Sequence, residues 1–244
     1  MPFLIAALLL LAPAARADSA LYFSWNDCAL GSESLQTFVF DCGSEAGAEE
    51  LFCAFRMPLA TGADVLGITA IVDIQSAATS LPDWWRLGAV GECRSGSLGV
   101  SGDFVLSAAC VDPWQGQAVS EIQAYNAGEP RGGVNQARIK AVCGVIPALA
   151  RTLDGTSVYY GLKLVIQNTH STGAAACAGC LQPACLVLNS IEVKRLEGAP
   201  GGDLVLATPS PVNGNWARWQ GGGVDCGLVP VRNLTWGRVK SLYR

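Results

Sequence analysis

Two stretches of alternating apolar and polar residues, 159–167 and 185–194, constrain the fold of this chain most strongly. The apolar positions of the first stretch share one parity: Tyr160, Leu162, Leu164 and Ile166. Those of the second stretch also share one parity, with Asn189 as the polar exception on that face: Cys185, Val187, Ile191 and Val193. Alternation with a period of two is typical of a strand with one buried face, so we expect two strands here.

The loop between these two strands contains the densest group of cysteines in the chain. Cys177 and Cys180 lie in the loop, and Cys185 opens the second strand. Binding residues are often found on loops that a rigid sheet holds in place. The loop is therefore one place where we look for function.

The first 17 residues have the pattern of a secretory signal peptide. They form an apolar run that is too short to span a bilayer and that ends in small residues before Asp18. We expect cleavage after Ala17 and a secreted protein, extracellular or periplasmic. No later apolar run reaches the length of a membrane span, so none is expected in the mature chain.

Charge and composition narrow the function classes. Removal of residues 1–17 takes Arg16 from the 16 basic residues and leaves 15 against 20 acidic ones, a net charge of −5. Nucleic acid is excluded as an expected partner because binding it requires a basic surface. The 28 glycines and the low share of charged residues, 15%, favour a loop-rich β protein.

Short strand-like runs, separated by clusters of Gly, Pro, Asn and Asp, continue along the chain. They cover residues 20–25, 35–40, 50–56, 65–75, 84–90, 104–109, 120–125, 137–145, 204–207 and 216–220. Residues 66–74 are nearly all apolar, as in a strand that is covered on both faces. The pattern predicts an all-β fold, an antiparallel β-sandwich or jelly roll with few short helices.

The predicted organisation has three parts. After the signal peptide of residues 1–17, residues 18–232 form a single β-sandwich domain. Residues 233–244 form a C-terminal amphipathic helical tail, since Trp236, Val239 and Leu242 recur at helical spacing. Within the domain, we expect a short helix at residues 147–153.

Ten cysteines after a signal peptide predict disulfides. The set comprises Cys28, Cys42, Cys53, Cys93, Cys110, Cys143, Cys177, Cys180, Cys185 and Cys226. Nearness in sequence suggests that Cys28 pairs with Cys42 and that Cys93 pairs with Cys110. If the last four cysteines pair among themselves, Cys53 and Cys143 remain as a long-range pair.

Zinc is the alternative reading of the Cys177, Cys180 and Cys185 cluster, with Cys226 or His170 as the fourth ligand. The version with His170 would leave seven cysteines and therefore one unpaired thiol. The version with Cys226 leaves an even six, but an oxidising compartment still favours disulfides. We therefore predict no metal and no cofactor.

The sequence shows no catalytic constellation. His170 is the only histidine, and the chain has no Gly-x-Ser-x-Gly motif, so the usual nucleophilic arrangements are poorly supported. A pair of carboxylates could hydrolyse a glycoside, but the adjacent Glu49 and Glu50 would point to opposite faces of a strand. We predict that the protein is not an enzyme.

Tryptophan is the most suggestive residue type for binding. The candidates are Trp84 with Trp85, and Trp216 with Trp219. Residues one or three apart on a strand lie on opposite faces, so each pair should place one ring inward and one outward. An exposed indole offers a flat apolar face with a polar N–H group, which suits stacking on sugar rings. The alternative is that these rings fill the core.

Four blocks of the chain resemble an unnamed group of secreted bacterial proteins of unknown function. These blocks are residues 25–28, 81–85, 177–180 and 236–244. Separately, the tyrosine-rich strand and the later run of residues 186–193 are similar in rhythm to the closing strands of jelly-roll carbohydrate-binding modules. Where those modules carry an acidic pair before an isoleucine, this chain has Asn189 and Ser190. The second resemblance implies a carbohydrate ligand.

The sequence therefore predicts a secreted, noncatalytic binding or structural protein, with a polysaccharide or another cell-surface component as its partner. One alternative is a subunit of a surface layer or fibre. Another is a carbohydrate-active enzyme, which would need two carboxylates facing each other across a groove. A further hypothesis is that the C-terminal tail acts as a sorting or docking signal.

Overall fold

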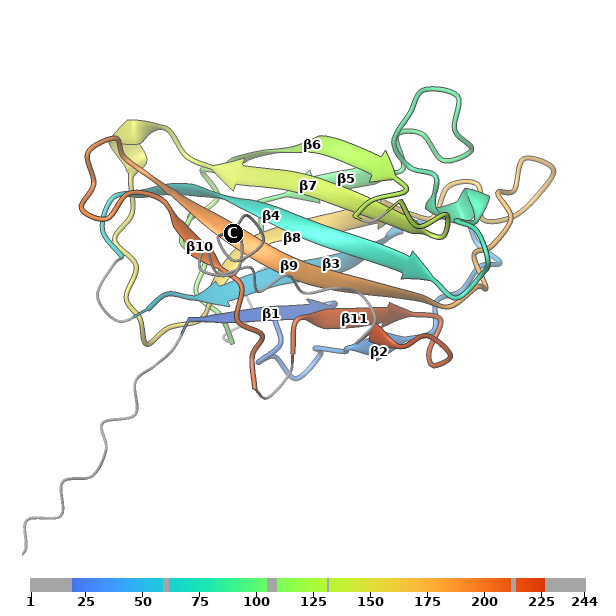
Figure 1. The fold of residues 1–244 in the computed structure, drawn as a ribbon, viewed down its shortest axis with the longest axis horizontal. Coiled ribbons are helices and arrows are strands. Elements are labelled where there is room, and N and C mark those ends of the chain that lie inside the picture. Colours follow the sequence, from blue (N-terminus) through green and yellow to red (C-terminus); the bar gives the residue numbers. More distant parts are fainter. Residues whose placement is uncertain (1–18, 59–61, 105–108, 131, 212–213, 227–244) are drawn as a thin grey trace, which may run out of the picture.

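The computed structural model describes residues 19–58, 62–104, 109–130, 132–211 and 214–226. Within these ranges the chain is built from strands and two single-turn 3-10 helices (Figure 1). The strands are β1 (Ala20–Trp25), β2 (Thr37–Phe38), β3 (Ala48–Arg56), β4 (Val65–Ser76), β5 (Leu98–Ser101), β6 (Val119–Ala127), β7 (Gln136–Gly144), β8 (Tyr159–Gln167), β9 (Ala184–Arg195), β10 (Leu204–Leu206) and β11 (Trp216–Trp219). The 3-10 helices are η1 (Asp83–Trp85) and η2 (Pro147–Leu149).

The strands form two sheets. The smaller sheet has the order β1-β3-β8-β5, and all its neighbours are antiparallel. The larger sheet has the order β2-β11-β9-β4-β7-β6, with β10 beside β9, and its one parallel pair is β2 with β11. The predicted all-β class with few short helices is confirmed, whereas the jelly-roll strand order stays a prediction.

One hydrophobic core holds the two sheets together in a sandwich-like arrangement. Fully buried side chains of both sheets belong to it, such as Leu164 on β8 and Ile139 on β7. In β7 the buried positions alternate with solvent-facing ones such as Lys140, as a strand with one covered face requires. β4 lies between β9 and β7 and is buried along most of its length, which fits its nearly all-apolar sequence.

Both strands that the alternation predicts are present, but a bulge interrupts each pattern. In β9 the pairing with β4 shifts between Ile71 and Val72, so that Asn189 has no direct partner. Before the bulge, Cys185 and Val187 pack in a small outer cluster, whereas Ile191 and Val193 beyond it belong to the main core. A bulge adds one residue and so moves the following side chains to the other face.

The first alternating stretch changes face in the same way. The pairing of β3 with β8 shifts between Cys53 and Ala54, opposite the unpaired Gly161. As a result Tyr160 packs against the ring of Phe52, which lies opposite Lys163 in the ladder. Tyr160 therefore shares a face with Lys163, and the prediction that placed it with Leu162, Leu164 and Ile166 is wrong.

Some predicted elements differ from those found. Residues 84–90 are not a strand, because Trp84 and Trp85 lie in η1 and both are buried. Adjacent residues on a strand would point to opposite faces, whereas one tight turn allows both rings to face the core. The predicted helix at residues 147–153 is the shorter η2. The signal peptide and the C-terminal tail lie outside the described residues.

The disulfide pattern corrects the predicted pairings. The bonds join Cys28 with Cys110, Cys42 with Cys180, Cys93 with Cys177, and Cys185 with Cys226. The predicted pairs Cys28–Cys42 and Cys93–Cys110 are therefore wrong, because the loops that meet in space come from distant parts of the chain. Four such bonds are typical of a protein that folds outside the cytoplasm.

Cys53 and Cys143 are free thiols and not the predicted pair. Cys53 lies on β3 in the smaller sheet, and Cys143 lies on β7 in the larger one. Both are buried members of the main core, where a cysteine acts as a small apolar side chain. Burial raises the pKa of both thiols, that of Cys143 to about 12.

Candidate functional site

The predicted tryptophan platform is largely buried. Trp84, Trp85 and Trp219 are fully buried, and the Trp219 ring centre lies 5.5 Å from that of Trp84 and 5.4 Å from that of Trp85. These three rings fill the core, so the prediction that they bind a ligand is wrong. Trp216 is the exception, because it is only partly buried and lies on the outer face of the larger sheet.

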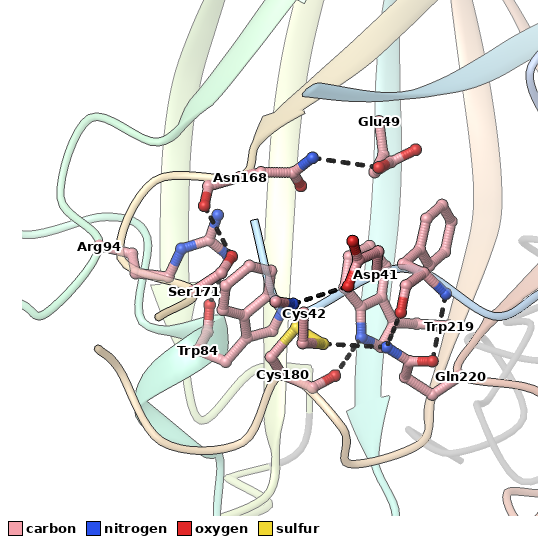
Figure 2. Close-up of a disulfide and its surroundings, with 12 residues drawn as sticks. Asp41, Cys42, Glu49, Trp84, Arg94, Asn168, Ser171, Cys180, Trp219 and Gln220 are labelled. Carbon is pink, nitrogen blue, oxygen red and sulfur yellow. Dashed lines mark hydrogen bonds between the residues drawn. A yellow bond between two sulfur atoms is a disulfide. The ribbon is translucent and has the colours of Figure 1, made fainter. Parts of the chain in front are cut away.

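The three buried rings support a group of loops at one end of the molecule, which we call the stapled end. It comprises residues 39–47, 77–97, 168–183 and 220–226, which all connect at the same ends of the two sheets (Figure 1). The Cys42–Cys180 and Cys93–Cys177 bonds join these loops to one another. Figure 2 shows the first of these bonds beside Trp84 and Trp219.

Arg94 is buried in the middle of the stapled end. It donates hydrogen bonds from Nε to the carbonyl of Thr169 (3.1 Å), from Nη1 to that of Trp84 (3.0 Å), and from Nη2 to that of Gln167. Desolvation lowers the pKa of Arg94 to about 9, so the guanidinium is still charged at neutral pH. Arg94 lies in the loop after β4, and its side chain joins this loop to the end of β8 and to the loop between β8 and β9. Its role is therefore structural.

The cysteine loop between β8 and β9 is held from two sides. The backbone N–H of Trp84 donates to the carbonyl of Ala178 (2.9 Å), and Nε1 of Trp219 donates to the carbonyl of Cys180 (2.6 Å). Since Cys177, Cys180, Cys185 and Cys226 are all in disulfides, they offer no thiolates, and the zinc alternative is wrong. His170 is exposed at the edge of this loop.

An open pocket of about 550 Å³ lies on the stapled end. The loop that follows β4 and the cysteine loop line it together, with Ser80, Asp83, Arg86 and Gln182 among its polar side chains. Asp83 and Arg86 form an exposed ion pair at 3.4 Å. The pocket is polar and shallow, and no tryptophan ring lines it.

The outer face of the larger sheet brings together residues from five strands. The ladder places Trp216 opposite Val187, Val187 opposite Asp73, and Asp73 opposite Arg138, which in turn lies opposite Asn126. We call this set the outer-face row. With neighbouring strands about 4.8 Å apart, the row is about 19 Å long.

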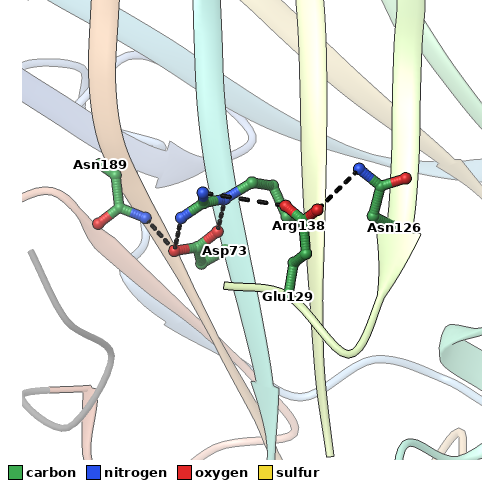
Figure 3. Close-up of polar contacts among 5 residues, drawn as sticks. All are labelled: Asp73, Asn126, Glu129, Arg138 and Asn189. Atoms are coloured by element: carbon green, nitrogen blue, oxygen red, sulfur yellow. Dashed lines mark hydrogen bonds and ion pairs between the residues drawn. The ribbon is translucent and has the colours of Figure 1, made fainter. Parts of the chain in front are cut away.

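A buried carboxylate holds the centre of the outer-face row (Figure 3). Asp73 is fully buried and accepts hydrogen bonds from Nε (2.6 Å) and Nη2 (2.8 Å) of Arg138 and from the amide of Asn189. The bulge in β9 places Asn189 beside this carboxylate. Hydrogen bonding to Asp73 raises the pKa of Arg138, and Glu129 lies 3.9 Å from the same guanidinium.

The other end of the row is aromatic. Trp216 packs with Val224 against a small cluster made of Val187 and the disulfide-bonded Cys185 and Cys226. The guanidinium carbon of Arg218 lies 4.7 Å from the centre of the Trp216 ring. The accessible groups of the row are thus Trp216 at one end and Arg138 with Asn126 at the other, and the buried Val187 and Asp73 lie between them.

Two further predictions concern metal ligands and the carboxylates Glu49 and Glu50. Their His, Cys, Asp and Glu side chains form no group of three that could hold a metal ion. Glu50 is paired with Lys163 at 2.6 Å, and Glu49 accepts a hydrogen bond from Asn168 at 3.1 Å. The two adjacent carboxylates are therefore engaged with different partners and do not face each other.

Sequence reasoning found Trp216 but missed Asp73, Arg138 and Arg218. The sequence did contain a signal for Asp73, because it is the one charged residue inside the apolar run of residues 66–74.

The described part of the chain has no helix that is long and apolar enough to cross a membrane. A comparison of the sequence with protein-family models finds no match, and a comparison with curated proteins finds none either.

Proposed function

We propose that the protein is a secreted, noncatalytic binding protein that holds a carbohydrate or cell-envelope polymer on the outer-face row. The observation that carries the proposal is the register that aligns Trp216, Arg138 and Asn126 across the larger sheet. Partly buried indoles stack on sugar rings, and fixed amide and guanidinium groups bind hydroxyls. A row of about 19 Å suits an extended polymer better than a single small molecule.

The row also has the rigidity that binding requires. Asp73 fixes the orientation of Arg138 and Asn189, and Trp216 packs against the cluster that contains the Cys185–Cys226 bond. Side chains that are already ordered lose little conformational entropy when a ligand arrives. The row therefore offers preorganised groups on strands and not on a loose loop.

A glycan array followed by pull-down on the best ligands tests this proposal. We expect Trp216→Ala to weaken binding at least about tenfold, the loss of about 1.4 kcal/mol that one stacked ring supplies, and Asn126→Ala to weaken it by up to about tenfold through the loss of one hydrogen bond. Arg86→Ala, in the pocket of the stapled end, is the matched control and should leave binding unchanged. If only Arg86→Ala loses binding, the ligand binds in the pocket of the stapled end and not on the outer-face row. If the protein binds no glycan, the proposal is refuted.

A surface-layer or fibre subunit is the second candidate, and an apolar groove favours it. The groove has a volume of about 560 Å³ and lies where β4, β6 and β7 meet the adjoining loops. Val119 and Ile146 in its lining are 78% and 62% exposed. Exposed apolar side chains that lie together mark association surfaces. A monodisperse monomer at high protein concentration would contradict this candidate.

A further inference from the structure

The cations on the outer face of the larger sheet differ in whether they have partners. Arg138 is bonded to Asp73, and Lys194 lies 2.8 Å from Glu192 and 2.9 Å from Asp203. The guanidinium of Arg218, by contrast, makes no hydrogen bond or ion pair with the described residues, and its Nε is buried without a partner. Among the described residues, the Arg218 guanidinium thus has no hydrogen-bond acceptor.

The position of this guanidinium restricts which ligand groups can accept its hydrogen bonds. It is held against the Trp216 ring at 4.7 Å, at the β11 end of the outer-face row. A guanidinium is a planar fork of N–H donors that matches the two oxygens of a carboxylate. A ligand that packs against the exposed part of Trp216 would bring its substituents to the Arg218 guanidinium, which lies over the ring.

We infer that the outer-face row selects polysaccharides whose sugars carry carboxylates, and that Arg218 is the residue that binds the carboxylate. This inference rests on the proposed function, because it names the ligand class of the same site. Uronic acids combine the two required features, an apolar ring face and one carboxylate on each sugar.

The distribution of charge also restricts the ligand. The mature chain has a net charge of −5, so a densely charged polyanion would be repelled by the molecule as a whole. The Arg218 guanidinium beside the row can bind a carboxylate locally, since screening limits the long-range repulsion to about 8 Å at physiological salt. A polymer with one charge per sugar fits this balance better than double-stranded nucleic acid, which carries one charge per about 1.7 Å, or a heavily sulfated chain.

The experiment compares binding to polygalacturonate, to its fully methyl-esterified form, and to a neutral glucan. Esterification removes the charge and keeps the sugar backbone, so the comparison measures the effect of the carboxylate charge alone. We expect the wild-type protein to bind the acid at least tenfold more tightly than the ester. Arg218→Gln should remove that preference, whereas Arg86→Gln, which changes an exposed arginine on the stapled end, should keep it.

The outcomes separate the two proposals. Equal binding of the acid and the ester by the wild-type protein would overturn the carboxylate inference and leave the proposed function standing. Tighter binding of a sulfated polysaccharide than of polygalacturonate would also overturn it. Failure of every glycan to bind would refute the proposed function itself. The wild-type comparison decides the inference even if Arg218→Gln does not fold, which circular dichroism would show.

Discussion

The guanidinium carbon of Arg94 lies 3.3 Å from the centre of the Trp84 ring, with both side chains fully buried. A cation in this position is attracted by the face of the indole, while its N–H groups bond to three backbone carbonyls. The hydrogen bond from Nη2 to the carbonyl of Gln167 joins the loop that follows β4 to the end of β8. The stapled end is therefore held by a buried arginine as well as by disulfides.

Replacing Arg94 should destabilise the fold. Arg94→Met keeps a long apolar side chain but leaves buried carbonyls without donors, so we expect a loss of about 3 kcal/mol in the free energy of unfolding. The loss should be similar at pH 6 and pH 8, because both values lie below the lowered pKa of about 9. Urea denaturation measures it. Arg86→Met, which breaks only an exposed ion pair, should change stability by less than about 1 kcal/mol.

The two free thiols, Cys53 and Cys143, should not react with thiol reagents in the folded protein. Burial raises the pKa of Cys143 to about 12 and that of Cys53 further, so almost no thiolate exists at pH 8. We expect no reaction with a thiol-specific reagent in the native state and two thiols per chain after denaturation. A non-reducing peptide map should give the four pairs of the structure, and any Cys53–Cys143 peptide would contradict it.

Gly179 should not tolerate a side chain. Its backbone has a φ of +106°, and an added Cβ would lie 2.3 Å from Cβ of Pro82. Gly179→Ala should therefore push the cysteine loop away from the loop that contains Pro82, at a cost of about 1–3 kcal/mol. Gly173→Ala is the control, since its φ is also positive but nothing lies within 4 Å of the added Cβ. Equal thermal shifts in both variants would contradict the steric explanation.

Removing the buried carboxylate should weaken both stability and binding. Asp73→Ala leaves Arg138 and Asn189 without their common acceptor, and we expect a loss of about 2–4 kcal/mol in unfolding experiments. Glu129→Ala removes a more exposed carboxylate at 3.9 Å and should cost less than about 1 kcal/mol. If the two variants are equally stable, Asp73 does not organise the row.

Local periodicity predicted most strands and the all-β class, because alternation reflects burial directly. It failed at the bulges opposite Cys53 and beside Asn189, since one extra residue changes which face the following side chains occupy. The disulfides could not be predicted for a different reason. Cys42 meets Cys180 only because the ends of two sheets bring their loops together, and sequence distance contains no information on that contact.

The candidate site was only partly predictable. Trp216 is identifiable as an aromatic residue on a strand, but whether it or Trp219 faces outward depends on the neighbouring sheet. Arg138 and Arg218 look like ordinary surface cations in the sequence. Arg138 is paired with Asp73, whereas Arg218 has no ion pair with any described residue, and this difference arises from the order in which β11, β9, β4 and β7 lie side by side.

The distances along the chain between bonded cysteines affect how the protein is made. Partners lie 41 to 138 positions apart, so each amino-terminal cysteine is synthesised well before its partner. Cys28 meets Cys42 and Cys53 first, and premature oxidation would trap a bond that only thiol exchange can undo. Correct maturation therefore requires oxidation to wait for the last strands or a catalyst that reshuffles early errors.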